Sequence, residues 1–169
     1  MLVSNGGKHS ISNVLASIID PGDEVVLLAP YWVSYPEMIK LYGGTSKVVS
    51  SSIYEEFQPP LEDVEEALKG GAKTIIVNSP NNPSGIHYSE TWMKNFAELM
   101  KKYDDVTIIS DEIYYELNYF DPKPTYFYQY SPELLERTII IDGVSKNMAL
   151  TGLRIGFCIA PKELITVMS

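Results

Sequence analysis

The sequence holds a single cysteine, Cys158, among its 169 residues. One thiol cannot form an internal disulfide or a cysteine-rich zinc site, and such low cysteine use is typical of proteins in a reducing cytosol. The chain also lacks an unbroken apolar run of the roughly 18 residues that a membrane-spanning helix needs. Residues 1–7 carry neither the positive charge nor the apolar stretch of a signal peptide. The sequence therefore predicts a cytoplasmic protein with no membrane partner.

Positive charge is scarce as well. The chain has 13 Lys and Arg residues against 22 Asp and Glu residues, which gives a formal net charge of -9 at pH 7. No basic run is longer than Lys101-Lys102. A chain of this charge offers no electrostatic footprint for nucleic acid or for an anionic membrane, so we expect neither as a partner.

What the chain does contain is a regular alternation of short apolar runs and amphipathic segments. The apolar runs are rich in Val and Ile, as in strands covered on both faces, and they span residues 24–29, 46–50, 74–78, 106–110, 138–142 and 156–160. The amphipathic segments predict helices over 9–19, 35–42, 61–69 and 89–102, the last with Ser89 as its N-cap. This order predicts an α/β fold, a three-layer sandwich on a mainly parallel sheet.

Both ends of the chain are abrupt. The sequence reaches the Gly6-Gly7 turn with almost no lead-in, and residues 161–169 end within the predicted start of a helix. We therefore expect residues 1–169 to be one domain of a longer protein, truncated at both ends.

Chemically distinctive residues follow the predicted strands at their carboxyl ends, where open α/β sheets bind ligands. Trp32 follows the first strand, Asn82 the third, Asp111 the fourth and Lys146 the fifth. Taken singly, each has an ordinary explanation: a core aromatic, a turn, a helix cap or a solvated lysine. Their gathering at one edge of the sheet predicts a binding site.

The side chains at this edge supply complementary chemistry. Gly6-Gly7 before a helix offers N–H groups and a positive dipole end to a phosphate, and Arg154 adds a guanidinium clamp. Trp32 can stack on a flat ring, and Asp111 can stabilise positive charge on that ring. Lys146 can form a Schiff base once its amine is neutral, which burial and nearby positive charge favour. A phosphate, a cationic ring and an aldehyde together describe pyridoxal 5'-phosphate (PLP).

These residues lie in motifs that resemble those of the class I aminotransferases, PLP-dependent enzymes of fold type I. The motifs cover essentially the whole chain: Gly6-Gly7-Lys8, Pro30 to Pro36, Asn78 to Gly85, Ser110 to Tyr114, and Ser145-Lys146 followed by Thr151 to Gly156. Their order and spacing are most similar to the bacterial aspartate aminotransferase branch. The resemblance implies transamination between an amino acid and a 2-oxo acid, and it identifies the chain as the large, PLP-binding domain.

The resemblance also assigns roles to residues around the cofactor ring. Lys146 matches the lysine that holds the cofactor and moves a proton, and Asp111 matches the carboxylate that keeps the pyridine nitrogen protonated. Tyr114 and Asn82 match the pair that hydrogen-bonds the phenolic oxygen of the ring. Trp32 matches the aromatic residue stacked on the face of the ring. Of these, Lys146, Asp111 and Tyr114 are the implied catalytic residues.

A second group is implied at the phosphate. Gly7 and Lys8 match residues whose backbone amides bind it, and Arg154 matches its guanidinium clamp. Many relatives carry a phosphate-binding serine three residues before the lysine. That position here is Gly143, and the resemblance assigns Ser145, directly before the lysine, to the cofactor site.

The resemblance further implies parts of the enzyme that lie outside residues 1–169. In the family, an arginine of a C-terminal small domain binds the substrate carboxylate. A tyrosine of an N-terminal arm reaches the phosphate of the partner subunit. Family members work as dimers with the active site at the interface, so we expect a homodimer.

Three alternatives stay open on the sequence. The chemistry could be that of a PLP-dependent lyase or of an aminocyclopropane-carboxylate synthase-like enzyme. The chain could be a non-catalytic, aminotransferase-like module of a transcription regulator. A dinucleotide-binding Rossmann domain is the third, although the chain has no G-x-G-x-x-G after its first strand.

Overall fold

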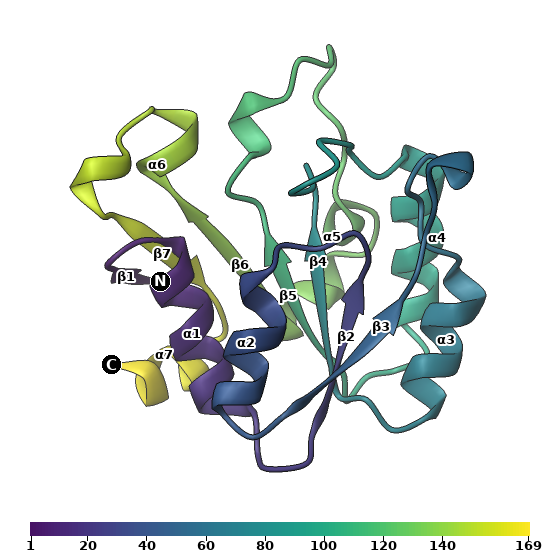
Figure 1. Ribbon diagram of the computed structural model, residues 1–169, viewed down its shortest axis with the longest axis horizontal. Coiled ribbons are helices and arrows are strands. Elements are labelled where there is room, and N and C mark those ends of the chain that lie inside the picture. Colours follow the sequence, from purple (N-terminus) through teal and green to yellow (C-terminus); the bar gives the residue numbers. More distant parts are fainter.

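Seven strands form one sheet at the centre of the protein, in the order β1-β7-β6-β5-β4-β2-β3 (Figure 1). The structure is a computed structural model that describes residues 1–169. The strands are β1 (Leu2–Ser4), β2 (Glu24–Leu28), β3 (Thr45–Val49), β4 (Thr74–Asn78), β5 (Thr107–Asp111), β6 (Thr138–Gly143) and β7 (Gly156–Ile159). Strands β2 to β6 pair in parallel, whereas β7 runs antiparallel to both β6 and β1. The predicted mainly parallel sheet is confirmed.

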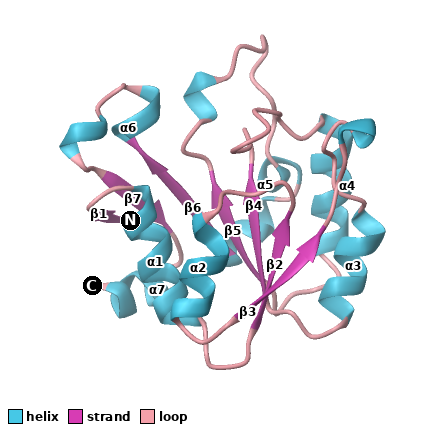
Figure 2. Cartoon of the chain, in the orientation of Figure 1, coloured by secondary structure: helices cyan, strands magenta, loops and turns pink.

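Helices cover both faces of this sheet (Figure 2). They are α1 (Gly7–Ile18), α2 (Ser34–Leu41), α3 (Leu61–Lys69), α4 (Glu90–Met100), α5 (Phe127–Tyr130), α6 (Val144–Asn147) and α7 (Lys162–Met168). The Ser89 hydroxyl accepts a hydrogen bond from the Trp92 N–H at 3.1 Å, so the predicted N-cap of α4 is present. None of the helices combines the length and apolar character needed to cross a membrane.

The core divides into two clusters, one on each side of the sheet, because successive strand residues point to opposite faces. In β4, Ile75 and Val77 belong to a cluster shared with α3, α4 and α5, whereas Ile76 belongs to a cluster shared with α1 and α2. All five residues of β4 are buried, as expected of a central strand covered on both faces. The three-layer sandwich is therefore confirmed.

The sequence missed the shortest elements. Strand β1 has three residues and helices α5 and α6 have four each, too few to show a hydrophobic period. Strand β1 matters for the site nonetheless. It pairs Ser4 with Gly156 of β7 and so brings the start of α1 against the C-terminal part of the chain.

Candidate active site

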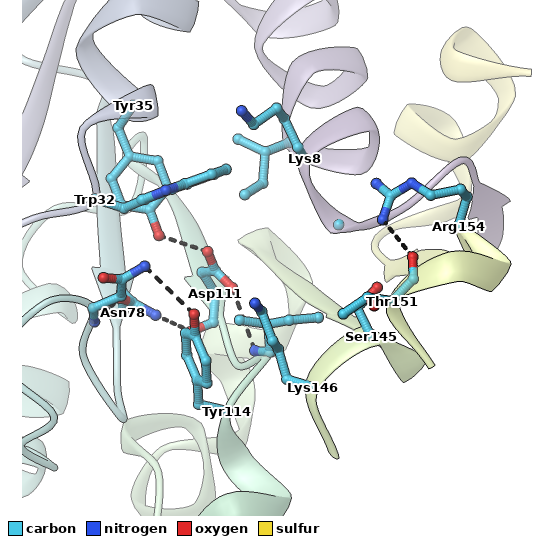
Figure 3. Close-up of a pocket in the computed structure, with 14 residues that line it drawn as sticks. Lys8, Trp32, Tyr35, Asn78, Asp111, Tyr114, Ser145, Lys146, Thr151 and Arg154 are labelled. Carbon is cyan, nitrogen blue, oxygen red and sulfur yellow. Dashed lines mark hydrogen bonds between the residues drawn. The ribbon is translucent and has the colours of Figure 1, made fainter. Parts of the chain in front are cut away.

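One cavity of about 240 Å³ lies at the carboxyl edge of the sheet, where β4, β5 and β6 end and α1 begins (Figure 3). It is lined by fourteen residues, among them every one that the sequence proposed for the site: Gly7, Lys8, Trp32, Asn82, Asp111, Tyr114, Ser145, Lys146 and Arg154. The remaining lining residues are Ile11, Tyr35, Asn78, Ile113 and Thr151. Segments that lie far apart in the sequence thus meet around one volume.

The start of α1 and the Arg154 guanidinium form one end of the cavity. Helix α1 begins at Gly7 with no side-chain cap, so its N-terminal dipole end faces this region. Arg154 donates hydrogen bonds to the backbone oxygens of Thr151 at 3.1 Å and Asn5 at 3.4 Å. These contacts hold the guanidinium beside the helix start, and together they make a site suited to a phosphate.

Gly156 makes this end possible, because a Cβ at this position would overlap the backbone of both Gly6 and Gly7. We predict that Gly156→Ala displaces the start of α1, weakens binding of PLP at least tenfold, and lowers the free energy of unfolding by about 1–3 kcal/mol. Cofactor titration and denaturant unfolding measure the two effects. Gly152→Ala is the matched control, since a Cβ there meets nothing within 4 Å. Equal behaviour of the two variants would contradict the prediction.

Asp111 is the buried acid of the cavity, with 4% of its surface exposed at the last residue of β5. Its Oδ2 accepts a hydrogen bond from the Tyr35 hydroxyl at 2.5 Å, and its Oδ1 accepts one from the Ile113 N–H at 3.3 Å. Burial raises the pKa of the carboxyl to about 6, although both hydrogen bonds oppose the shift. A buried carboxylate without a cation favours a positively charged partner in the cavity. No α-helix begins at Glu112, so the alternative of Asp111 as a helix cap is wrong.

Asn78 joins two parts of the cavity through its side-chain amide. The Nδ2 group donates a hydrogen bond to the backbone oxygen of Asp111 at 2.9 Å, and Oδ1 accepts one from the Asn82 N–H at 2.8 Å. Asn78 lies beside Asp111 in the parallel β4–β5 register. The amide therefore fixes Asp111 and Asn82 relative to each other.

Asn82 and Tyr114 form a hydrogen-bonded pair on the same side of the cavity. The Asn82 Nδ2 donates to the Tyr114 hydroxyl oxygen at 3.4 Å. Burial, with a contribution from the negative charge of Asp111, raises the pKa of Tyr114. The phenol therefore stays protonated at neutral pH and remains able to donate a hydrogen bond.

Lys146 lies on α6, and its side chain points toward those of Asp111 and Tyr114 in Figure 3. Its Nζ is 5.9 Å from the centre of the Tyr114 ring. Lys146 is exposed to solvent, so the burial that we expected around its side chain is absent from this chain. Ser145 lines the cavity beside it. A Cβ at Gly143 would overlap the backbone oxygen of Ile155, so the serine of other relatives does not fit there.

Trp32 and Lys8 lie on the side of the cavity opposite Lys146 (Figure 3). The Trp32 ring packs edge-on against Tyr35, with ring centres 5.4 Å apart and an angle of 90° between the planes. The Lys8 ammonium lies 4.8 Å from the centre of the Trp32 ring. The perpendicular Tyr35 ring holds the indole in place, which suits the indole to stacking on a planar group.

A comparison with known families assigns the chain. The model of the family "Aminotransferase class I and II" matches residues 1–169. The chain belongs to this family. It is 39% identical over 169 residues to the aspartate aminotransferase of Geobacillus stearothermophilus, a match that covers 100% of the chain and 43% of that protein. It is 38% identical over 168 residues to the aspartate/prephenate aminotransferase of Nitrosomonas europaea, covering 99% of the chain and 42% of that protein.

Solved structures of aminotransferases agree with this assignment. The chain matches the Thermus thermophilus aspartate aminotransferase with maleate at a TM-score of 0.90 and 40% identity, covering 99% of the chain and 42% of the other. The Thermotoga maritima aspartate aminotransferase matches at a TM-score of 0.91 and 40% identity, covering 99% and 44%. The aminotransferase resemblance is thereby confirmed. The chain spans less than half the length of these relatives.

PLP is the cofactor of this aminotransferase family, and the cavity fits it. The buried Asp111 carboxylate lacks a cation that a pyridinium nitrogen would supply. The uncapped helix start and the Arg154 guanidinium suit the phosphate. The Lys146 amine suits the aldehyde, and all of these groups surround one volume.

Proposed function

We propose that this chain forms the PLP-binding part of an active site. The reaction is an aspartate aminotransferase-like transamination between an amino acid and a 2-oxo acid. One observation carries the proposal. A single cavity gathers an amine at Lys146, a buried carboxylate at Asp111 and a guanidinium at Arg154. These are the partners that the aldehyde, the ring nitrogen and the phosphate of PLP need.

When bound, PLP supplies an aldehyde and an electron-withdrawing ring. Lys146 would bind the aldehyde carbon and, as a free amine, would move a proton from the substrate α-carbon to the carbon of the former aldehyde. Asp111 would hold a proton on the ring nitrogen, because a buried carboxylate favours a cationic neighbour. The Asn82–Tyr114 pair would donate hydrogen bonds to the ring oxygen, and Trp32 would pack on the ring face.

The phosphate would bind at the other end of the cavity. The backbone amides of Gly7 and Lys8 face this end with the positive dipole of α1, and Arg154 adds a permanent positive charge. We include Ser145 in this group because it lines the cavity next to Lys146. The two backbone amides, Arg154 and Ser145 would together hold the phosphate and so position the ring beside the other residues.

We further propose that residues 1–169 are the large, PLP-binding domain of a longer, homodimeric, cytoplasmic enzyme. Exposed apolar side chains follow Lys146 in the sequence: Met148, Leu150 and Leu153 are 61%, 40% and 57% exposed. Apolar surface of this kind beside a functional site is typical of an interface. The relatives named as aspartate aminotransferases, one of them solved with maleate, favour a dicarboxylic substrate.

The proposal is tested by adding PLP to the purified chain, recording the visible spectrum, and reducing with borohydride before mapping peptides. We expect an absorbance that borohydride abolishes and a PLP label on the peptide that contains Lys146. In the longer enzyme, aspartate and 2-oxoglutarate should then yield oxaloacetate and glutamate. Release of an unsaturated or ring-closed product would support the lyase or synthase alternative, and binding without turnover would support the regulator module. A chain that binds no PLP would overturn the proposal.

A further inference from the structure

The side chain of Tyr35 lies between two of the groups that we assign to the PLP ring. Tyr35 belongs to α2, lines the cavity and is 1% exposed. Its hydroxyl donates a hydrogen bond to Oδ2 of Asp111 at 2.5 Å, and its ring packs at 90° against the ring of Trp32 (Figure 3). One buried phenol thus contacts both the acid for the ring nitrogen and the indole for the ring face.

Two contacts with Trp32 hold this phenol in one place. The Tyr35 N–H donates a hydrogen bond to the backbone oxygen of Trp32 at 3.0 Å, at the start of α2. The two ring centres lie 5.4 Å apart, a distance typical of edge-on aromatic packing. Asp111 lies 76 positions further along the chain, at the end of β5. The hydroxyl therefore reaches the carboxyl from a helix that is fixed independently of β5.

Both oxygens of the Asp111 carboxyl accept a hydrogen bond, and the shorter bond comes from Tyr35. The other donor is the Ile113 N–H, at 3.3 Å from Oδ1. Burial and the negative charge of Asp111 raise the pKa of Tyr35, so the phenol stays protonated and can donate. A hydroxyl that donates to a carboxyl group favours the ionised form of that group. Tyr35 therefore orients Asp111 and stabilises its charge.

No other side chain supplies Asp111 with a donor. Asp111 takes part in no salt bridge, and the Tyr35 hydroxyl is the only side-chain group that donates a hydrogen bond to it. The negative charge of Asp142 on β6 opposes the ionisation of Asp111. The remaining ionisable neighbours, from the cavity and from the turns around it, are Lys8, Glu112, Tyr114, Tyr126 and Lys146.

We propose that Tyr35 is a positioning residue of the cofactor site that acts through Asp111. Its hydroxyl holds Oδ2 in place and keeps the carboxyl ionised, so that the acid meets the ring nitrogen in one orientation. The proposal rests on the proposed function, in which Asp111 faces that nitrogen. It goes beyond the proposed function by giving a role to a residue outside the groups assigned to PLP.

The first test removes the Tyr35 hydroxyl and measures Asp111 in the cofactor-free chain. Tyr35→Phe keeps a ring against Trp32, so only the donor is lost. The pKa of Asp111 is about 6, and loss of the donor should raise its midpoint by roughly half a unit or more. The pH dependence of the Asp111 carboxyl 13C NMR shift measures this midpoint.

Tyr42→Phe is the matched control. It removes a tyrosine hydroxyl at the other end of α2, where the partner is the Ser12 hydroxyl at 2.7 Å and the side chain does not line the cavity. Tyr42→Phe should leave the Asp111 midpoint unchanged. A role of Tyr35 in packing alone predicts the same null result for Tyr35→Phe.

The second test needs no substitution at Tyr35. In the wild-type chain, the 13Cζ shift of Tyr35 should change with the same midpoint as Asp111, because the hydroxyl responds to the charge of its acceptor. The change should vanish in Asp111→Asn. This measurement decides the point even where Tyr35→Phe fails to fold.

A wild-type midpoint in folded Tyr35→Phe, or a Tyr35 signal that does not follow Asp111, would overturn the proposal. PLP labelled with 15N at the ring nitrogen extends the test to the cofactor. In Tyr35→Phe the carboxylate is a stronger base, so the 15N shift should move toward that of a neutral pyridine, and an unchanged shift would also overturn the proposal. A raised Asp111 midpoint in a chain that binds no PLP would retain the role of Tyr35 and refute only the proposed function.

Discussion

Lys146→Ala should abolish the attachment of PLP that borohydride can fix, while the chain stays folded. The amine of Lys146 points toward Asp111 and Tyr114 and is the group we assign to the aldehyde carbon (Figure 3). Because Lys146 is exposed, its loss should change the free energy of unfolding by less than about 0.5 kcal/mol. Mass spectrometry of the reduced protein measures the label, and thermal unfolding measures the fold.

A second lysine makes this prediction specific. Lys8 also lines the cavity, but its ammonium lies over the Trp32 ring rather than beside Tyr114. Lys8→Ala should therefore still carry the label on the Lys146 peptide. Labelling that survives in Lys146→Ala and vanishes in Lys8→Ala would mean that the two lysines have been assigned the wrong way round.

Asp111→Asn should make the cofactor-free chain more stable at pH 7 and yet unfit for transamination. The pKa of Asp111 is raised to about 6 by burial, so the folded chain holds this proton more tightly than the unfolded chain. Between about pH 4 and pH 6, where the unfolded and then the folded carboxyl ionise, rising pH therefore costs stability. Above that range the loss in the free energy of unfolding is constant. The neutral side-chain amide of Asp111→Asn removes this loss, so the variant should gain on the order of 2 kcal/mol in the free energy of unfolding.

Unfolding in urea at pH 4.5 and pH 7 checks this prediction. The stability difference between Asp111→Asn and wild type should be small at the lower pH and largest at the higher. In the longer enzyme, the same substitution should lower the turnover number on the order of a hundredfold or more, since the ring nitrogen loses its charged partner. A variant that is less stable at pH 7, or that turns over at the wild-type rate, would show that Asp111 carries no buried charge of this kind.

Much of the fold could be predicted because its central strands are buried on both faces. Strand β4 forms over residues 74–78 as the continuous apolar run predicts, and helix α3 occupies residues 61–69, also as predicted. Parallel strands place their carboxyl ends at one edge. That geometry is why residues as far apart as Trp32, Asp111 and Lys146 could be grouped from the sequence before any coordinates were known.

The rest of the site could not be predicted because it depends on packing rather than on residue type. Tyr35 has the spacing of an ordinary core residue of α2, and only the structure shows that its hydroxyl donates a hydrogen bond to Asp111. Asn78 has the position of a strand end, and its hydrogen bond to the Asp111 oxygen depends on the register of β4 against β5. Its place at the start of the Asn78 to Gly85 motif was a signal for the site, but it did not show which groups the amide would bind. The exposure of Lys146 likewise depends on what covers α6, which local sequence does not encode.

The close approach of Gly156 to Gly6 and Gly7 has a consequence for the order in which the chain acquires its function. The phosphate end of the cavity joins residues separated by about 150 positions, through the pairing of Ser4 with Gly156 and the bond from Arg154 to Asn5. Contacts so distant in sequence form late, because the loop between them must close first. A chain growing from the ribosome therefore carries Trp32, Asn82 and Asp111 long before it can hold a phosphate. Binding of the cofactor would therefore indicate that the N-terminal and C-terminal segments of the domain have paired.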